Sequence, residues 1–211
     1  MNRRGFLLVL EGIDGTGKST LARSLAQWLR ENGREVVTSR EPTDGPHGTA
    51  LRQSAKSGRL SLEDEFALFL KDRAEHVATL IAPALDRGAV VILDRYYFST
   101  AAYQGARGLD PQSIIAANEK FAPIPDLVLL LDLDPAVGSA RITRRGDTLD
   151  DFEALDDQRE VRRIFLSLHR PFIHRVDAFP EFAVVFQEAR AIVEAALFNL
   201  QSHASLARKT S

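Results

Sequence analysis

Residues 5–19 read GFLLVLEGIDGTGKS, and this stretch decides the fold. Its first part is a short, continuous apolar run that ends at Glu11, as expected for a strand covered on both faces. Residues 12–19 then fit the pattern G-x-x-x-x-G-K-[ST] without a mismatch. Residues 18–32 follow with leucines at helical spacing and a glycine directly after them. A buried strand, this loop and an amphipathic helix, in that order, are the context that a phosphate-binding loop (P-loop) requires.

The residue types of the loop indicate its chemistry. Glycines let successive backbone N–H groups turn inward around phosphate oxygens, and the helix N-terminus adds partial positive charge. Lys18 can reach the β- and γ-phosphates of a nucleotide, and the hydroxyl of Ser19 can ligate Mg²⁺. A simple glycine-rich turn is the alternative, which the complete strand, motif and helix disfavour. The predicted ATP-binding residues are Gly12, Ile13, Asp14, Gly15, Thr16, Gly17, Lys18, Ser19 and Thr20.

Further apolar runs alternate with helical patterns along the chain. We predict strands at 35–40, 89–94, 127–133 and 182–186, and helices at 62–85 and 111–121. This alternation predicts an α/β fold, a three-layer sandwich in which helices cover both faces of a five-stranded parallel sheet, of the P-loop NTPase type. We expect one domain, 1–211, with a mobile lid at 144–157 and a frayed polar tail at 201–211.

The composition excludes several classes of function. The chain of 211 residues has a net charge of −2, so no global basic field is available to hold a nucleic-acid polymer. It has no cysteine, which excludes disulfides, Cys-ligated zinc and a thiol nucleophile. It has no apolar run of about 18 residues, and the N-terminal run lacks a signal-peptide cleavage site. We therefore expect a cytoplasmic enzyme with neither a membrane nor a nucleic-acid polymer as partner.

A second polar segment, Asp94-Arg95-Tyr96, ends the strand predicted at 89–94. A carboxylate at the carboxyl end of a parallel strand lies at the edge of the sheet where ligands bind. Asp94 can hold a water of Mg²⁺ or orient Lys18, which makes Ser19 and Asp94 the candidate metal-binding residues. A helix N-cap is the structural alternative for Asp94.

Arginines are the candidate ligands of an acceptor phosphate, because the guanidinium binds phosphate through two parallel hydrogen bonds. Arg73 lies four residues after Phe69, so a helix places an aromatic ring and a guanidinium on one face. Phe69 can equally belong to the core, and for any single Arg a solvated surface position is the commoner explanation. The candidates are Arg52, Arg73 and Arg95 for the acceptor, and Arg141, Arg144 and Arg145 for the transferring group.

The loop alone leaves the class of P-loop protein open. GTPases need a base-selecting Asn-Lys-x-Asp element, which the sequence does not contain, and motors are usually larger. Small-molecule kinases are the leading class, in which cations offset the repulsion between an acceptor phosphate and the triphosphate.

The sequence also resembles bacterial thymidylate kinases over nearly its whole length. The segments that carry this resemblance are EGIDGTGKST at 11–20, REP at 40–42, F at 69, DRAEH at 72–76, DRY at 94–96, AYQG at 102–105, RGL at 107–109, PDL at 125–127 and LLD at 130–132. The resemblance implies ATP-dependent phosphorylation of dTMP to dTDP for dTTP synthesis, with Mg²⁺ as cofactor and a homodimer as the common assembly.

The resemblance also implies residue roles. Phe69 would stack on thymine, Gln104 would bind the base edge, Thr100 would face the base, and Tyr103 would lie under the sugar and disfavour a 2′-hydroxyl. Asp14 would contact the sugar hydroxyl and the metal region. The implied dTMP-binding residues are Glu41, Pro42, Arg52, Phe69, Arg73, Arg95, Thr100, Tyr103 and Gln104, with Arg73 and Arg95 on the phosphate. The implied catalytic residues are Lys18, Asp14, Arg95, Arg144 and Arg145.

One branch of this family has an arginine in the P-loop, and in the other the lid supplies that cation. In this sequence Gly15 and Thr16 stand where the first branch has its arginine. The resemblance therefore implies that Arg144 and Arg145 close over the γ-phosphate from the lid.

Four segments depart from the family pattern. Thr43 to Gly48 replace Gly-Gly-Thr after Pro42, and the lid lacks the usual Asp-Arg pair. Leu70-Lys71 stand where small residues are usual, which predicts a lysine close to the base pocket. Gln187-Glu188-Ala189 follow the strand predicted at 182–186 in place of an Asp-Ala pair.

Three hypotheses remain at this point. The first is a thymidylate kinase, and the second is a kinase for another nucleoside monophosphate or deoxynucleoside. The third is a non-catalytic regulatory protein in which ATP only switches conformation. The third needs no acceptor site, so a cavity that gathers the implied acceptor residues would disfavour it.

Overall fold

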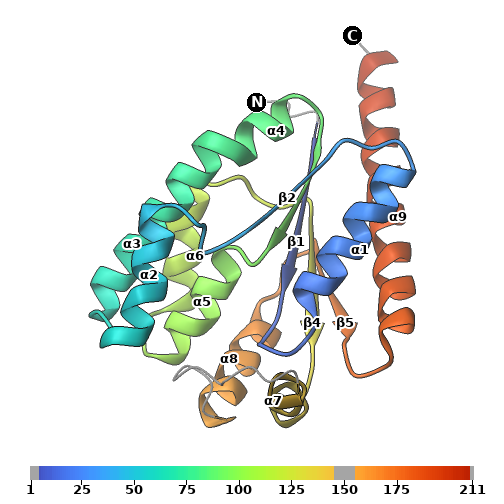
Figure 1. The fold of residues 1–211 in the computed structure, drawn as a ribbon. Helices are drawn as coiled ribbons and strands as arrows, with labels where there is room; N and C mark the ends of the chain where they lie inside the picture. The colour runs from blue at the N-terminus through green and yellow to red at the C-terminus, as the bar shows by residue number, and fades with distance from the viewer. Residues whose placement is uncertain (1–4, 145–154, 210–211) are drawn as a thin grey trace.

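A computed structural model of the chain describes residues 5–144 and 155–209 (Figure 1). Its sheet has five strands, all parallel, in the order β2-β3-β1-β4-β5. The strands are β1 (Phe6–Glu11), β2 (Val36–Arg40), β3 (Val90–Asp94), β4 (Leu127–Asp132) and β5 (Ile173–Asp177). The helices are α1 (Lys18–Glu31), α2 (Pro46–Ser57), α3 (Leu62–His76), the π-helix η1 (Val77–Ile81), α4 (Ala82–Asp86), α5 (Tyr97–Ala106), α6 (Pro111–Glu119), α7 (Pro135–Arg144), α8 (Leu155–Ser167) and α9 (Phe182–Lys209).

Two hydrophobic cores lie on the two faces of the sheet. Successive side chains of a strand point to opposite faces, so Leu7 and Val9 enter one core while Leu8 and Leu10 enter the other. The first core is closed by η1, α4, α5, α6 and α8, and the second by α1 and α9 (Figure 1). The predicted three-layer α/β sandwich with a five-stranded parallel sheet is therefore confirmed.

The register of the central strands places the functional segments at one edge of the sheet. Leu10 pairs with Asp94 on β3, and Glu11 pairs with Leu130 on β4. The chain that leaves β1 therefore enters the P-loop beside the ends of both neighbouring strands. Ligands of open α/β sheets bind at this carboxyl edge.

The fifth strand was predicted in the wrong place. Residues 182–186 begin α9, where Val185, Ala189 and Val193 are buried at helical spacing. The strand is β5, whose sequence IHRVD is partly polar because it forms an edge of the sheet. The Asp-Ala pair that the family pattern places after the last strand is consequently present, as Asp177-Ala178.

The predicted lid and tail are only partly within the described residues. Residues 155–157 belong to α8, and Arg144 ends α7, whereas residues 145–154 lie outside the described part of the chain. Residues 201–209 continue α9, and the fraying of this tail stays a prediction. The mobility of the lid stays a prediction.

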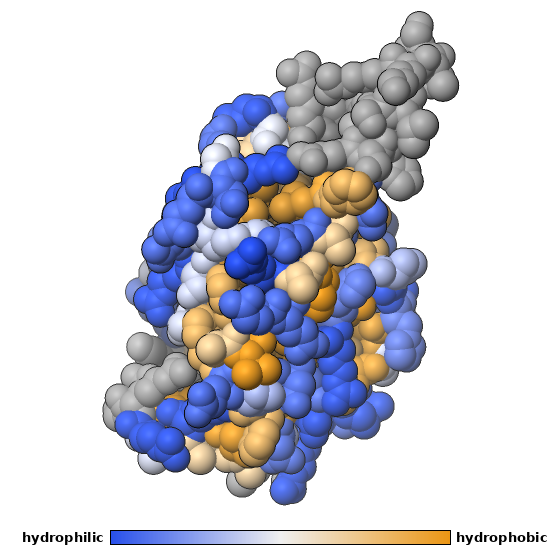
Figure 2. All heavy atoms as spheres, turned by 90° about the vertical axis from the view of Figure 1, so that its right-hand side faces the viewer, coloured by the Kyte–Doolittle hydropathy of each residue, from blue (hydrophilic) through white to orange (hydrophobic). Residues whose placement is uncertain are grey.

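The surface on the side of α1 and α9 is mostly hydrophilic, with smaller apolar areas between (Figure 2). The exposed apolar side chains of α9 include Phe182, Val184 and Phe198. Scattered apolar residues of this kind are ordinary on protein surfaces. Within residues 5–144 and 155–209, no helix is both long and apolar enough to span a bilayer.

Candidate active site

The P-loop depends on glycines at positions where other residues would be strained. Gly12, Gly15 and Gly17 have φ angles of 137°, 79° and 92°, in the region that favours glycine. A Cβ atom at Gly12 would lie only 2.3 Å from the carbonyl oxygen of Leu131 on β4. Gly17 caps the N-terminus of α1, so the loop leads directly into a helix end that favours anions.

Lys18 lies across this loop. Its Nζ donates hydrogen bonds to the carbonyl oxygens of Gly12 and Ile13, at 2.9 and 2.8 Å. Burial and the neighbouring Arg95 lower the pKa of Lys18 to about 8, although Asp14 partly opposes this shift. The negative charge of a nucleotide phosphate would favour the protonated ammonium at this position.

The two candidate metal-binding residues are in contact. The hydroxyl of Ser19, at the start of α1, donates a hydrogen bond to the carboxylate of Asp94, at the end of β3. Hydroxyl and carboxylate oxygens are the hard ligands that Mg²⁺ prefers, and this ion usually takes its remaining ligands from water and substrate phosphates. These two side chains therefore fit the ion that the sequence predicts.

Arg95 joins the P-loop to the neighbouring cavity. Its guanidinium forms an ion pair with Asp14 and lies 5.1 Å from the ring centre of Tyr103. The Tyr103 hydroxyl donates to the other oxygen of Asp14 at 2.9 Å. Burial alone would raise the pKa of Asp14, but Arg95 and Lys18 outweigh it and hold that pKa at about 2.

The backbone of Arg95 is itself unusual, because its φ of 72° lies in the left-handed region. Strained residues of this kind persist where the surrounding structure holds them. Glu11, at the end of β1, supplies that support: its Oε1 accepts hydrogen bonds from the backbone N–H groups of Tyr96 and Ser99, at 2.9 and 3.1 Å. Burial raises the pKa of Glu11 to about 7, against the hydrogen bond from the Ser99 hydroxyl, which lowers it. Sequence reasoning did not assign Glu11 any role.

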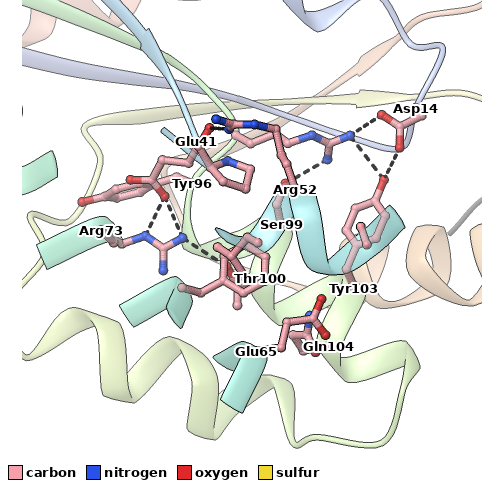
Figure 3. Close-up of a pocket in the computed structure, with 15 residues that line it drawn as sticks. Asp14, Glu41, Arg52, Glu65, Arg73, Tyr96, Ser99, Thr100, Tyr103 and Gln104 are labelled. Atoms are coloured by element: carbon pink, nitrogen blue, oxygen red, sulfur yellow. Dashed lines mark hydrogen bonds and ion pairs between the residues drawn. The ribbon is translucent and has the colours of Figure 1, made fainter. Parts of the chain in front are cut away.

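A cavity of about 280 Å³ opens beside this cluster, near the size of a small-molecule site. Figure 3 shows the side chains that α2, α3, α5 and the segment after β2 direct into it. All nine residues that the family resemblance implied for the acceptor line it, together with Asp14. The other lining residues are Leu51, Ala55, Glu65, Tyr96 and Ser99.

Arg73 lines this cavity and is almost completely buried. Its guanidinium pairs with Glu41 at 2.7 Å and donates to Asn118 and Thr100, at 2.5 and 3.1 Å. These contacts use most of its five N–H donors, and they place it beside Thr100 and away from Asp14 (Figure 3). The structure therefore brings Arg73 into the predicted cavity, on the side opposite the P-loop.

Several residues that sequence reasoning did not assign hold Arg73 in place. His76 lies 3.0 Å from the other Glu41 oxygen, and its second ring nitrogen lies 2.8 Å from the Ser39 hydroxyl. Asn118 comes from α6, far along the chain. His76 follows Arg73 by three residues, so the sequence could have placed the two on one face of a helix. No local pattern in the sequence connects Asn118 to Arg73.

The segment after Pro42 departs from the family pattern but is well anchored. The carboxylate of Asp72 accepts hydrogen bonds from the backbone N–H and the hydroxyl of Thr43, at 2.9 and 2.6 Å. Arg52 donates to the carbonyl oxygens of Pro42 and Thr43, at 3.0 and 2.7 Å. This side of the cavity is therefore held by polar contacts that are partly buried.

The expectation that Lys71 lies close to the base pocket is wrong. Lys71 is exposed, whereas Phe69 and Arg73 both line the cavity. Residues four apart share one face of a helix, and the residue midway between them points to the opposite face.

A second cavity lies on the other side of the P-loop, and sequence reasoning missed it. Its lining includes Thr16 and Gly17 from the loop, Arg141 from α7 and Ala178 from the chain after β5. Arg141 donates to the carbonyl oxygens of Ala178 and Phe179, at 2.9 and 3.0 Å. Because the fifth strand was predicted at 182–186, there was no reason to place residues 178–185 beside the P-loop.

Of the three arginines predicted for the transferring group, Arg141 lines the second cavity, and the other one within the described residues is Arg144. It is exposed at the end of α7 and is not among the residues that line either cavity. Arg145 lies outside the described residues. The start of α7 nevertheless packs closely against the P-loop, because a Cβ atom at Gly138 would lie only 2.7 Å from the carbonyl oxygen of Asp14.

The sheet, the glycine loop and its lysine define a P-loop nucleotide-binding protein that has a cavity with an aromatic side chain and several arginines beside its phosphate site. A family model described as thymidylate kinase matches residues 10–189. The chain is 56% identical over 193 residues to the thymidylate kinase of Xanthomonas campestris pv. campestris (strain B100), covering 92% of this chain and 85% of that protein. It is 57% identical over 176 residues to the thymidylate kinase of Akkermansia muciniphila, covering 83% and 85%. The chain belongs to the thymidylate kinase family.

Proposed function

We propose that this chain transfers the γ-phosphoryl group of ATP to dTMP, giving dTDP and ADP. The observation that carries the proposal is the Asp14–Arg95–Tyr103 cluster, which connects the P-loop to a cavity lined by Phe69, Thr100 and Gln104. A P-loop needs no such cavity to bind ATP alone. A cavity with an aromatic face and amide and hydroxyl groups suits a nucleobase. The names of the relatives support thymidylate as the acceptor.

In this proposal an oxygen of the acceptor phosphate attacks the γ-phosphorus, and the bond to the β,γ-bridging oxygen breaks. Lys18 and the N–H groups of the loop stabilise charge on the β- and γ-phosphates. Arg95 lies between the loop and the cavity, where it can offset the repulsion between the two phosphate groups. Ser19 and Asp94 would hold Mg²⁺, which when bound neutralises charge on the phosphate oxygens.

The second cavity is the proposed place of the donor base. It adjoins Thr16 and Gly17, so a nucleotide whose phosphates occupy the loop can extend into it. The guanidinium of Arg141 is held there by two carbonyl oxygens, which offers a planar surface for a purine. Arg144 and Arg145 stay the predicted lid cations. The homodimer stays a prediction of the family resemblance, and the cytoplasmic location stays a prediction from the sequence.

A coupled assay that offers dTMP, dUMP, dCMP, AMP and GMP separately tests the proposal. We expect rapid turnover of dTMP and slow turnover of the other four. Faster turnover of another acceptor would assign a different nucleotide kinase. Slow loss of ATP with none of them would indicate the regulatory class instead.

A further inference from the structure

A buried carboxylate lines the acceptor cavity. Glu65, on α3, has 2% of its surface exposed and lines the cavity one helical turn before Phe69. It forms ion pairs with Arg107, at the end of α5, and with Arg59, at 3.6 Å. A buried carboxylate is retained only with such partners, because an unpaired buried charge is strongly destabilising. Neither Glu65 nor Arg107 has a part in the phosphoryl transfer described above.

Arg107 also contacts the residue that is expected to bind the base edge. Its Nη1 donates to Oε1 of Gln104 at 3.3 Å, and Gln104 lies next to Glu65 (Figure 3). A guanidinium carries donors and no acceptor, so the oxygen end of the amide must face Arg107. The NH₂ end must then face the other way. The contact thus selects one of the two orientations that the Gln104 amide can adopt.

The orientation of this amide matters because pyrimidines differ at the edge it would contact. Thymine presents an acceptor at O4 and a donor at N3, whereas cytosine presents a donor at N4 and an acceptor at N3. An amide that rotates freely can match either pattern. An amide with one fixed orientation matches only one of them and leaves an unpaired polar group against the other.

We propose that Arg107, itself held by Glu65, fixes the orientation of the Gln104 amide and thereby excludes aminopyrimidine acceptors such as dCMP. Arg107 is then a positioning residue for base specificity. This inference rests on the proposed function, because it requires that Gln104 contacts the acceptor base.

The test is the ratio of kcat/KM for dCMP to kcat/KM for dTMP. In Arg107→Met we expect this ratio to rise about tenfold, the size of one lost hydrogen-bond preference, with KM for ATP unchanged. Because this variant leaves Glu65 with one partner fewer, the double variant Glu65→Gln, Arg107→Met is measured as well and should show the same rise. Arg107→Lys keeps a donor and should retain most of the wild-type ratio.

Two controls separate orientation from general damage. Arg59→Met removes the other cation beside Glu65 and leaves the Arg107–Gln104 contact in place, so its ratio should stay within about twofold of wild type. In a Gln104→Ala background, Arg107→Met should no longer change the ratio. An unchanged ratio in both Arg107→Met and the double variant would overturn the inference. A wild-type protein without dTMP turnover would overturn the proposed function first, and this inference with it.

Discussion

The P-loop and the acceptor cavity are built from different kinds of groups. The loop is one continuous stretch, residues 12–19, whose groups are mostly backbone N–H donors placed by glycines. The cavity is assembled from side chains on α2, α3, α5 and the segment after β2, which are far apart in the sequence. Its buried charges, such as Arg73 and Glu41, depend on one another for partners. The loop therefore depends on its own backbone conformation, whereas the order of the cavity depends on its network of side chains.

The largest expected effect is on the loop. Lys18→Ala should lower kcat about 10³-fold, because one preorganised charge on the transferring phosphate is lost. The affinity for dTMP, measured by calorimetry, should change little, because the cavity does not include Lys18. Lys71→Ala is the matched control, since Lys71 is exposed on α3 and its removal should leave kcat within about twofold. Near-normal turnover in Lys18→Ala would contradict the assigned role of the loop.

Substitutions in the buried network of the cavity should lower the stability of the protein as well as its affinity for the acceptor. Arg73→Met should lower the free energy of unfolding by about 3 kcal/mol, because it leaves Glu41 buried and short of a partner. Arg163→Met breaks an exposed ion pair with Glu160 and should cost less than about 1 kcal/mol. Urea unfolding measures both. Equal small losses in the two variants would show that the buried network does not hold the cavity together.

A smaller change at the cavity separates the two binding sites. Gln104→Ala should raise KM for dTMP about tenfold while KM for ATP stays constant, because Gln104 lines only the acceptor cavity. Steady-state kinetics with each substrate varied in turn measure the difference. Equal losses for both substrates would refute the separation of the two sites.

The smallest effect concerns Asp14, which joins loop and cavity. Its folded-state pKa of about 2 lies below the ordinary 3.8, so the unfolded chain binds the proton more readily. The stability that this carboxylate contributes is therefore present above about pH 4 and is lost as the pH falls towards 2. In Asp14→Asn the free energy of unfolding should not show this decrease, so the difference between the variant and the wild type, measured by urea unfolding at each pH, should shrink on acidification. The difference should be about 1 kcal/mol or less, since the side chain is 36% exposed.

The same contrast explains what could be predicted from the sequence. Local patterns of spacing or composition were enough to predict the P-loop, four of the five strands and α3. The edge strand β5 was missed because His174 and Arg175 interrupt its apolar pattern, while the β-branched start of α9 imitated a strand.

The cavity required more than local patterns. The family resemblance named all nine of the acceptor residues that line it, but not the residues that position them. Glu65, Asn118 and His76 act through partners 35 to 45 residues away along the chain. Glu11 acts through Tyr96 and Ser99, which lie 85 and 88 residues away. Contacts of that kind follow from the packing of helices and, apart from the three-residue spacing of Arg73 and His76, leave no local pattern in the sequence.

The central claim is that ATP in the loop and dTMP in the cavity meet across Arg95. A crystal structure with a non-hydrolysable ATP analogue and dTMP tests it most directly. We expect the β- and γ-phosphates against residues 12–19, the thymine between Phe69 and Gln104, and the dTMP phosphate facing the γ-phosphate beside Arg95. A dTMP molecule bound outside the cavity, or with its phosphate turned away from the loop, would contradict it.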